Sequence, residues 1–187
     1  MEYIIIGILI VILVLVVMYV IIERNNLVQL NNKVQEAFST MDVYLKKRWD
    51  LVPNLVSNVK GYAKHEEETF EKVTAIRSGN YNDLKQDEKI DTNLKLEEGL
   101  SNFSAIIENY PTLKADTSFL ELNENLNKIE EDIANSRKYY NAVVRMYNNK
   151  VEMFPSNMIA NMFNFKCKKM FETGSDERKN VNINLGK

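Results

Sequence analysis

The sequence is poor in the residues from which reactive and cross-linked sites are built. Its 187 residues include one cysteine, Cys167, and one histidine, His65. A lone thiol excludes an internal disulfide framework, which fits either a reducing compartment or a helical domain that needs no disulfide. The stretch from His65 to Thr69 begins like a zinc-protease motif, but a threonine stands where the second histidine must be. One histidine also cannot supply the two Glu-x-x-His pairs of a di-iron bundle.

Other catalytic patterns are missing as well. The chain has no Ser-His-Asp set, no glycine-rich phosphate loop and no Cys-x-x-Cys motif. Cys167 has Lys166 and Lys168 beside it, which would lower its pKa, but no partner base. Acidic runs are interpreted as solvated helix faces paired with nearby lysine or arginine: Glu66–Glu68, Glu97–Glu98 and Glu130–Asp132. We therefore predict no enzyme activity, no metal and no cofactor.

The chain also lacks a strong charge imbalance and any strand-like pattern. Its formal net charge is -2, so no global field favours nucleic acid. No long segment alternates with period two, whereas apolar residues recur at helical spacing almost throughout. We predict an all-α protein in which an N-terminal transmembrane helix continues into an antiparallel bundle of about four long helices.

Three prolines divide this pattern into helices. The first helix is expected to run to about residue 48, and Asp50 is expected to cap a second, antiparallel helix with Pro53 in its first turn. The alternative is that Pro53 lies within one continuous helix. The second helix should end at residues 78–80, and a third should cover about residues 90–110, before Pro111.

The fourth apolar stripe, residues 119–154, has the heptad regularity of a coiled coil. Ser118 and Glu121 have the spacing of a capping box at its start. The pairs Tyr140-Asn141 and Tyr147-Asn148 repeat at seven residues, and we expect these polar groups to fix the helix register. Pro155 ends the stripe, and a short amphipathic segment, residues 156–165, follows.

Tyr3 to Ile22 is an uncharged apolar run at the N-terminus. As a helix it spans about 30 Å, the thickness of a bilayer core. It lacks the basic flank and small-residue cleavage site of a signal peptide, so we expect an uncleaved anchor. The predicted domains are an anchor (residues 1–25), a helical bundle (26–172) and a disordered tail (173–187). A small excess of lysine and arginine after the run favours an outside N-terminus and a cytoplasmic domain.

Two clusters are candidate interaction sites. The first is a predicted helix–helix corner with three cations and an aromatic residue, which is either a solvated corner or a docking surface for an acidic partner: Lys46, Lys47, Arg48, Trp49 and Asp50. The second follows Pro155 and is either an interfacial helix at the membrane or a short helix packed on the bundle: Met162, Phe163, Phe165, Lys166, Lys168, Lys169 and Phe171.

Several blocks resemble the LemA family of bacterial membrane proteins. The most specific is Asp42–Val56, which includes Lys-Lys-Arg and Pro-Asn-Leu-Val, and it continues through Val59–Glu66. Tyr110–Lys114, the Tyr-Asn pairs and Phe154–Asn157 complete the pattern over roughly residues 1–172. The resemblance implies a single-pass protein of the bacterial inner membrane with a helical cytoplasmic domain. It implies no reaction, and it implies links to membrane stress and to a membrane metalloprotease of the HtpX type.

The sequence thus favours a membrane-anchored helical adaptor or scaffold that binds protein partners at the cytoplasmic face. The alternative is a protein that shapes the membrane or binds the lipid surface directly.

Overall fold

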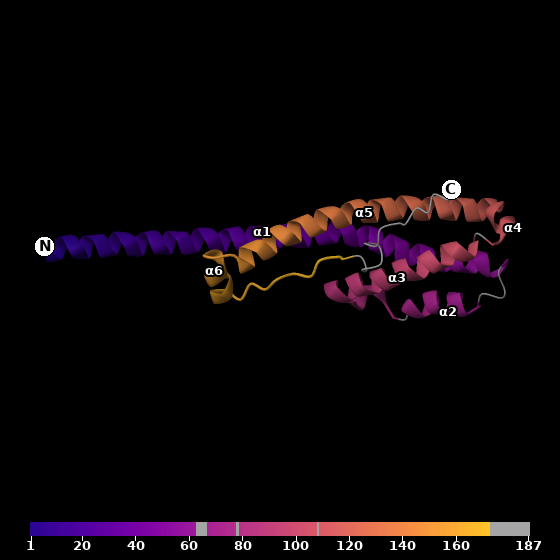
Figure 1. The fold of residues 1–187 in the computed structure, drawn as a ribbon, viewed down its shortest axis with the longest axis horizontal. Helices are drawn as coiled ribbons and strands as arrows, with labels where there is room; N and C mark the ends of the chain where they lie inside the picture. The colour runs from indigo at the N-terminus through magenta and orange to yellow at the C-terminus, as the bar shows by residue number, and fades with distance from the viewer. Residues whose placement is uncertain (63–66, 78, 108, 173–187) are drawn as a thin grey trace, which may run out of the picture. The chain divides into compact units, whose positions relative to one another are not determined.

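The computed structural model describes residues 1–62, 67–77, 79–107 and 109–172. The described residues form six α-helices and one 3-10 turn and contain no strand (Figure 1): α1 (Glu2–Lys60), α2 (Glu67–Ile76), η1 (Tyr81–Asp83), α3 (Gln86–Ile107), α4 (Pro111–Lys114), α5 (Thr117–Glu152) and α6 (Ser156–Met162). The prediction of an all-α fold is confirmed. His65 and the predicted tail, residues 173–187, lie outside the described residues.

Helix α1 passes through Pro53 without ending. The predicted break at Asp50 and the antiparallel return after it are therefore wrong, and the alternative of one continuous helix is correct. Pro53 removes one backbone hydrogen bond, but the buried stripe continues across it at helical spacing: Leu45, Trp49, Val52, Leu55, Val56 and Val59 are all buried. Packing on both sides of the proline keeps the chain helical.

The chain divides into two compact units, and α1 and α5 contribute to both. Unit 1 comprises residues 1–41 and 136–170. Among the described residues, unit 2 comprises residues 42–135 together with Phe171 and Glu172.

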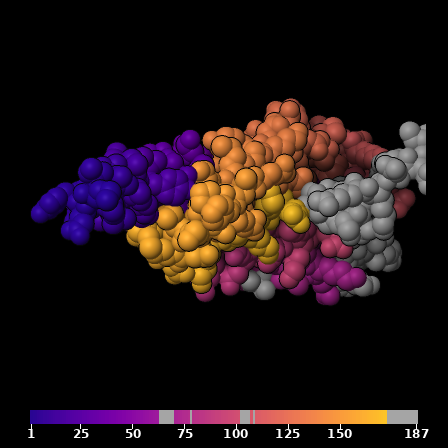
Figure 2. All heavy atoms as spheres, turned by 60° about the vertical axis from the view of Figure 1, so that its left-hand side comes forward, coloured from indigo at the N-terminus to yellow at the C-terminus, as the bar shows by residue number. Residues whose placement is uncertain are grey.

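In unit 1, the second half of α5 runs antiparallel to α1. Phe38 and Tyr140 pack edge to face with ring centroids 5.9 Å apart, and farther along Lys150 Nζ lies 2.8 Å from Glu23 Oε1. Later residues of α5 thus lie beside earlier residues of α1, as expected for antiparallel helices. Figure 2 shows the end of α5 and α6, in orange and yellow, gathered beside the indigo N-terminal part of α1. The core repeats at heptad spacing on α1: Leu27, Val34 and Met41 are fully buried.

Residues 163–170, here called the C-terminal strap, form a turn at Phe163 and Asn164 followed by an irregular segment without helix. Helix α6 ends at Met162, before the predicted end at residue 165, because Asn164 adopts a left-handed φ of 57°. Phe165 N–H donates to the Ala160 carbonyl and Asn164 N–H to that of Asn161, which is the pattern of a Schellman cap. Asparagine tolerates the left-handed region better than most residues, so it turns the chain away from α6.

The strap is held by α5. The Tyr140 hydroxyl donates to the Lys169 carbonyl at 2.7 Å. The Asn148 side-chain amide donates to the Lys168 carbonyl at 2.9 Å and accepts from Lys168 N–H at 2.8 Å. These bonds give the Tyr-Asn repeat a role that the sequence did not indicate, because Tyr140 and Asn148 bind the strap backbone.

Unit 2 contains α2, α3, α4 and parts of α1 and α5. Helix α2 packs on α3 at Gly99, where an added Cβ would lie 3.3 Å from side-chain atoms of Val73 and Ile76. The absence of a side chain at Gly99 therefore permits the close approach. Gly79, with φ of 109°, makes the turn that follows α2.

Asp116 caps the start of α5. Its Oδ1 accepts a hydrogen bond from Phe119 N–H at 2.9 Å, three residues on, as an N-cap side chain does. The predicted capping box at Ser118 and Glu121 is wrong because Thr117 is already helical. The Tyr62 hydroxyl donates to Asp116 Oδ2 at 2.9 Å and ties the end of α1 to the same cap.

Candidate functional site

The predicted docking cluster is split between the interior and the surface of unit 2. Arg48 and Trp49 are buried, with 0% and 5% of their surface exposed, while Lys47 and Asp50 are exposed and Lys46 is half-buried. Arg48 and Trp49 therefore cannot contact a docked partner, and the prediction is wrong for these two residues. The reason is the continuity of α1, which places them on its buried stripe instead of at a corner.

Arg48 is bound on two sides by protein groups. Its Nη1 donates to both carboxylate oxygens of Glu130 at 3.0 Å, and its Nη2 donates to the backbone carbonyl and the Oδ1 of Asn93 at 2.9 and 3.0 Å. Asn93 is fully buried, and Glu130 is 35% exposed at its side chain. The charge of Arg48 is thus compensated inside the fold. Its Nε is buried without a hydrogen-bond partner.

The polar network extends from Asn93 to α1 and η1. The Tyr81 hydroxyl donates to Asp42 Oδ1 at 2.6 Å, and Lys89 Nζ lies 2.7 Å from Asp42 Oδ2. Asn93 Nδ2 donates to the Lys89 carbonyl at 2.9 Å. Burial, followed by the bond to Asp42, strongly raises the pKa of Tyr81, which stays a neutral donor. This network joins α1, η1 and α3 and serves the fold.

Trp49 also has an internal role. Its ring lies 5.3 Å from that of Tyr81, and the Arg77 guanidinium lies 5.1 Å from its ring centroid. Desolvation lowers the pKa of Arg77. Sequence reasoning missed Arg77, Asn93 and the inward position of Glu130. A signal existed for two of them: Asn93 lies on the stripe of Ile90, Leu96 and Leu100, and Glu130 on that of Leu126 and Ile133.

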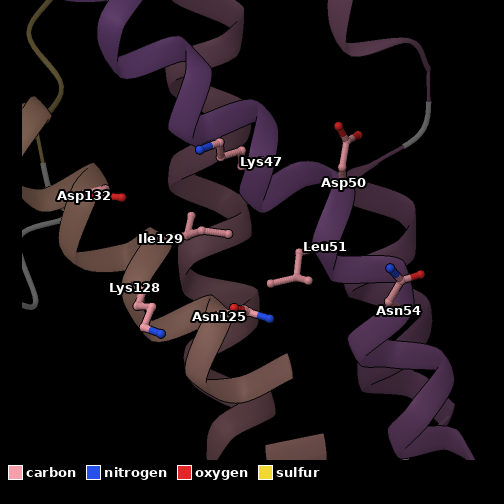
Figure 3. A pocket seen from close by; sticks show the side chains of 8 residues that line it. All are labelled: Lys47, Asp50, Leu51, Asn54, Asn125, Lys128, Ile129 and Asp132. Atoms are coloured by element: carbon pink, nitrogen blue, oxygen red, sulfur yellow. The ribbon is translucent and has the colours of Figure 1, made fainter. Parts of the chain in front are cut away.

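The exposed part of the cluster borders an open groove between α1 and α5 in unit 2 (Figure 3). The groove has a volume of about 530 Å³ and is lined by Lys47, Asp50, Leu51 and Asn54 of α1 and Asn125, Lys128, Ile129 and Asp132 of α5. Leu51 and Ile129 are half-buried and point into the space between the helices, while the other six are exposed. The groove thus has an apolar floor and a polar rim.

The rim of this groove balances its charges. It carries Lys47 and Lys128 against Asp50 and Asp132. Lys46 pairs with Asp50 at 2.6 Å, Lys128 pairs with Glu124 at 2.8 Å, and Lys47 lies 5.3 Å from the Tyr44 ring centroid. The excess of positive charge from which we expected an acidic partner is therefore absent at this surface.

The predicted membrane-interface residues lie in unit 1, apart from Phe171. Met162 and Phe163 are 61% and 40% exposed, Lys166 and Lys169 are exposed, and Phe165 and Lys168 are half-buried. Phe171 is 1% exposed, so its assignment to the interface is wrong. From Phe163 the chain is the C-terminal strap, so the basic residues do not continue an amphipathic helix.

Among the residues that the structure describes, the remaining reactive groups do not form a second site. Cys167 is exposed, and its Sγ lies 3.4 Å from Glu152 Oε1. Partial desolvation, then this carboxylate, raises the pKa of its thiol, which is opposite to the expectation from its lysine neighbours. Within the described residues, no group of three or more His, Cys, Asp or Glu could hold a metal ion.

Helix α1 has the length and apolar composition to cross a membrane, near its N-terminus. None of the residues in this window is buried. It is the one such helix in the described part of the chain.

Comparisons with known proteins identify similar sequences. The model of the LemA family matches residues 37–185, which begin within α1 beyond the apolar run. The chain is also 26% identical over 152 residues to Protein LemA of Metamycoplasma hominis. This match covers 80% of the chain and 68% of the relative.

Proposed function

The chain belongs to the LemA family, and from this premise we propose that it is a membrane-anchored adaptor that binds a protein partner through the groove between α1 and α5. The apolar run of α1 would span the bacterial inner membrane, with the N-terminus outside and the helical domain in the cytoplasm. The exposed apolar surface of that run supports the anchor, because such a surface is stable in lipid and costly in water.

The groove is the observation that carries the proposed adaptor role. A half-buried apolar floor with a rim of both charges is suited to a polypeptide segment that presents apolar side chains flanked by charged ones. A rim that carries both positive and negative charges favours one register of the bound segment and one partner over others. It contributes less to long-range electrostatic attraction of the partner. A membrane metalloprotease of the HtpX type, which the family resemblance implies, is the first partner to test.

Site-specific crosslinking tests this proposal. Photoreactive residues placed at Asn54 and Asn125, on opposite sides of the groove, should capture the same protein in native membranes. Asn127 is an exposed residue of the same α5 turn but does not line the groove, so a crosslinker there is the matched control. Equal capture from all three positions would contradict docking in the groove.

Charge reversal gives an independent test. The double substitution Lys47→Glu and Lys128→Glu should abolish the crosslinked product from Asn54 while the helical circular dichroism of the protein is retained. Lys95→Glu makes the same type of change at an exposed position of α3 outside the groove and should preserve the product. Unchanged capture by the groove variant would remove the proposal.

A further inference from the structure

Exposed apolar side chains gather where α5 turns into α6. Met153, Phe154, Met158, Met162 and Phe163 are 62%, 78%, 62%, 61% and 40% exposed, and they form what is here called the α5–α6 corner. Single exposed apolar side chains are ordinary on a protein surface, whereas a contiguous group marks an interaction site. In contrast, Ser156, Ile159 and Ala160 of α6 are buried, so α6 packs by one face and presents Met158 and Met162 outward.

The level of this corner along α1 is fixed by two contacts within unit 1. Lys150 near the end of α5 pairs with Glu23, the first charged residue after the apolar run. The Arg24 guanidinium lies 5.2 Å from the centroid of the Phe163 ring, beyond the end of α6. Both ends of the corner are therefore attached at the point where α1 changes from apolar to charged.

The chain beyond Lys150 extends toward the apolar run. Because α5 is antiparallel to α1, Met153 and Phe154 lie on the apolar side of Glu23, by about 5 Å at 1.5 Å per residue. Figure 1 agrees, because α6 lies beside α1 and nearer its N-terminal end than the last turn of α5. Val20 is half-buried, unlike its neighbours in the run, as expected if the corner reaches its level.

Glu23 and Arg24 mark the depth at which a bilayer spanned by residues 3–22 would pass from hydrocarbon to headgroups. Side chains about 5 Å closer to the hydrocarbon would lie at the headgroup–acyl boundary, where amphipathic protein segments bury their apolar faces. Arg24 and the exposed Lys166 would stand at headgroup level, where anionic lipids attract cations. The apolar side chains of the corner would then face the same bilayer as those of the anchor.

We propose that the α5–α6 corner is a second membrane contact, which inserts Met153, Phe154, Met158 and Met162 into the interfacial layer of the bilayer that anchors α1. This inference depends on the proposed function, since it requires residues 3–22 to span the membrane. The corner would contact lipid and not a protein partner. Attachment at the anchor and at the corner would fix the rotation of unit 1 about the axis of α1 relative to the membrane plane.

Depth-dependent fluorescence quenching in proteoliposomes tests the contact on the full-length chain. Cys167→Ala first removes the single native thiol, and a cysteine at Phe154 or Met158 is labelled with an environment-sensitive dye. The vesicles contain phosphatidylcholine and phosphatidylglycerol with or without brominated acyl chains. Cysteines at Ile12 in the apolar run and at Tyr139, 57% exposed on α5, are the lipid and solvent controls.

We expect brominated lipid to quench the dye at residues 154 and 158 several-fold more than at residue 139. Quenching at residue 12 without quenching at 154 and 158 would overturn the second contact but would still support the membrane anchor. No quenching at residue 12 would instead overturn the anchor, and the second contact with it. Blue-shifted emission at 154 without lipid quenching would mean that protein covers the corner, which also overturns the proposal.

Folding of the labelled variants is checked separately. Phe154 and Met158 are exposed, so cysteine at either position should leave the helical circular dichroism and the Tm unchanged. The double substitution Phe154→Ser and Met158→Ser should make a dye at residue 162 several-fold less quenched. The matched change Tyr139→Ser should leave that quenching as it was. Equal quenching in both variants would count against insertion of the corner.

Discussion

Buried polar side chains distinguish the interior of unit 2 from an ordinary helical core. Arg48 occupies a stripe position on α1, between Leu45 and Val52, and meets Asn93 and Glu130 on the stripes of α3 and α5. A buried cation is tolerated only when hydrogen bonds and a counter-charge replace its hydration. The three residues should therefore behave as one unit, whereas Lys46, two positions earlier, pairs with Asp50 at the surface.

Arg48→Met should be strongly destabilising. We expect a loss of about 3 kcal/mol in the free energy of unfolding, because Asn93 and Glu130 lose their donor inside the fold. Lys46→Met is the matched control on the same helix and should cost less than about 1 kcal/mol, since exposed ion pairs contribute little. Denaturant unfolding of the detergent-solubilised protein measures both, and similar losses would contradict the role assigned to Arg48.

Asp116 should make stability depend on pH. The Phe119 N–H, followed by the Tyr62 hydroxyl, holds the pKa of Asp116 below its ordinary value of 3.8. A lowered folded-state pKa stabilises the fold above the unfolded-state pKa, and this stabilisation is lost as pH falls through the folded-state value. Asp116→Asn retains a cap acceptor but cannot titrate in this range.

The Tm advantage of the wild type over Asp116→Asn should therefore be constant near neutral pH and shrink in the acid range below pH 3.8. Thermal unfolding followed by circular dichroism across this range gives the difference. Tyr62→Phe should reduce its pH dependence, because one of the two donors is then lost. A difference that does not change with pH would show that the charge of Asp116 does not contribute.

At the residue level the sequence predicted the surface better than the interior. Lys47 and Asp50 are exposed as expected, because charged residues off the apolar stripe face solvent. Arg48, Asn93 and Glu130 were missed because each was judged by its chemistry and not by its helical position. Their burial depends on one another, and only the packing of three helices shows that they meet.

The helices themselves follow closely from apolar periodicity, with instructive exceptions. The α3 and α5 stripes and their ends at proline were predicted within a few residues. Pro53 was misjudged because local propensity disfavours it inside a helix, while the stripe on both sides of it is buried. The strap could not be predicted, because no apolar pattern marks it and α5 side chains bond its backbone.

The strap should come loose when Asn148 is replaced. Asn148→Leu removes both bonds to Lys168, so trypsin should cleave after Lys166, Lys168 and Lys169 faster than in the wild type. Asn149→Leu changes the neighbouring exposed residue in the same way and should leave the cleavage rate unchanged. Mass spectrometry of the released C-terminal peptides measures the rate. Identical rates in the two variants would contradict attachment through Asn148.

For the whole molecule, the native Cys167 provides a built-in probe of topology. It is exposed, so an impermeant maleimide should label it after cell lysis but not in intact cells, if the domain is cytoplasmic. A cysteine introduced at Glu2 should show the opposite behaviour, because the N-terminus is expected outside. Alkaline carbonate should leave the protein in the membrane pellet. Labelling of Cys167 in intact cells, or extraction by carbonate, would overturn the proposed arrangement.

Helix α2 has 10 residues, fewer than an isolated helix needs to persist in water, and it packs on α3 where Gly99 lacks a side chain. Its amide protons are therefore protected from exchange with deuterium only while α2 remains packed on α3. Hydrogen–deuterium exchange in residues 67–76 should thus accelerate before exchange in the buried part of α3 does. This short segment would report any loosening of unit 2, including one caused by a partner in the groove.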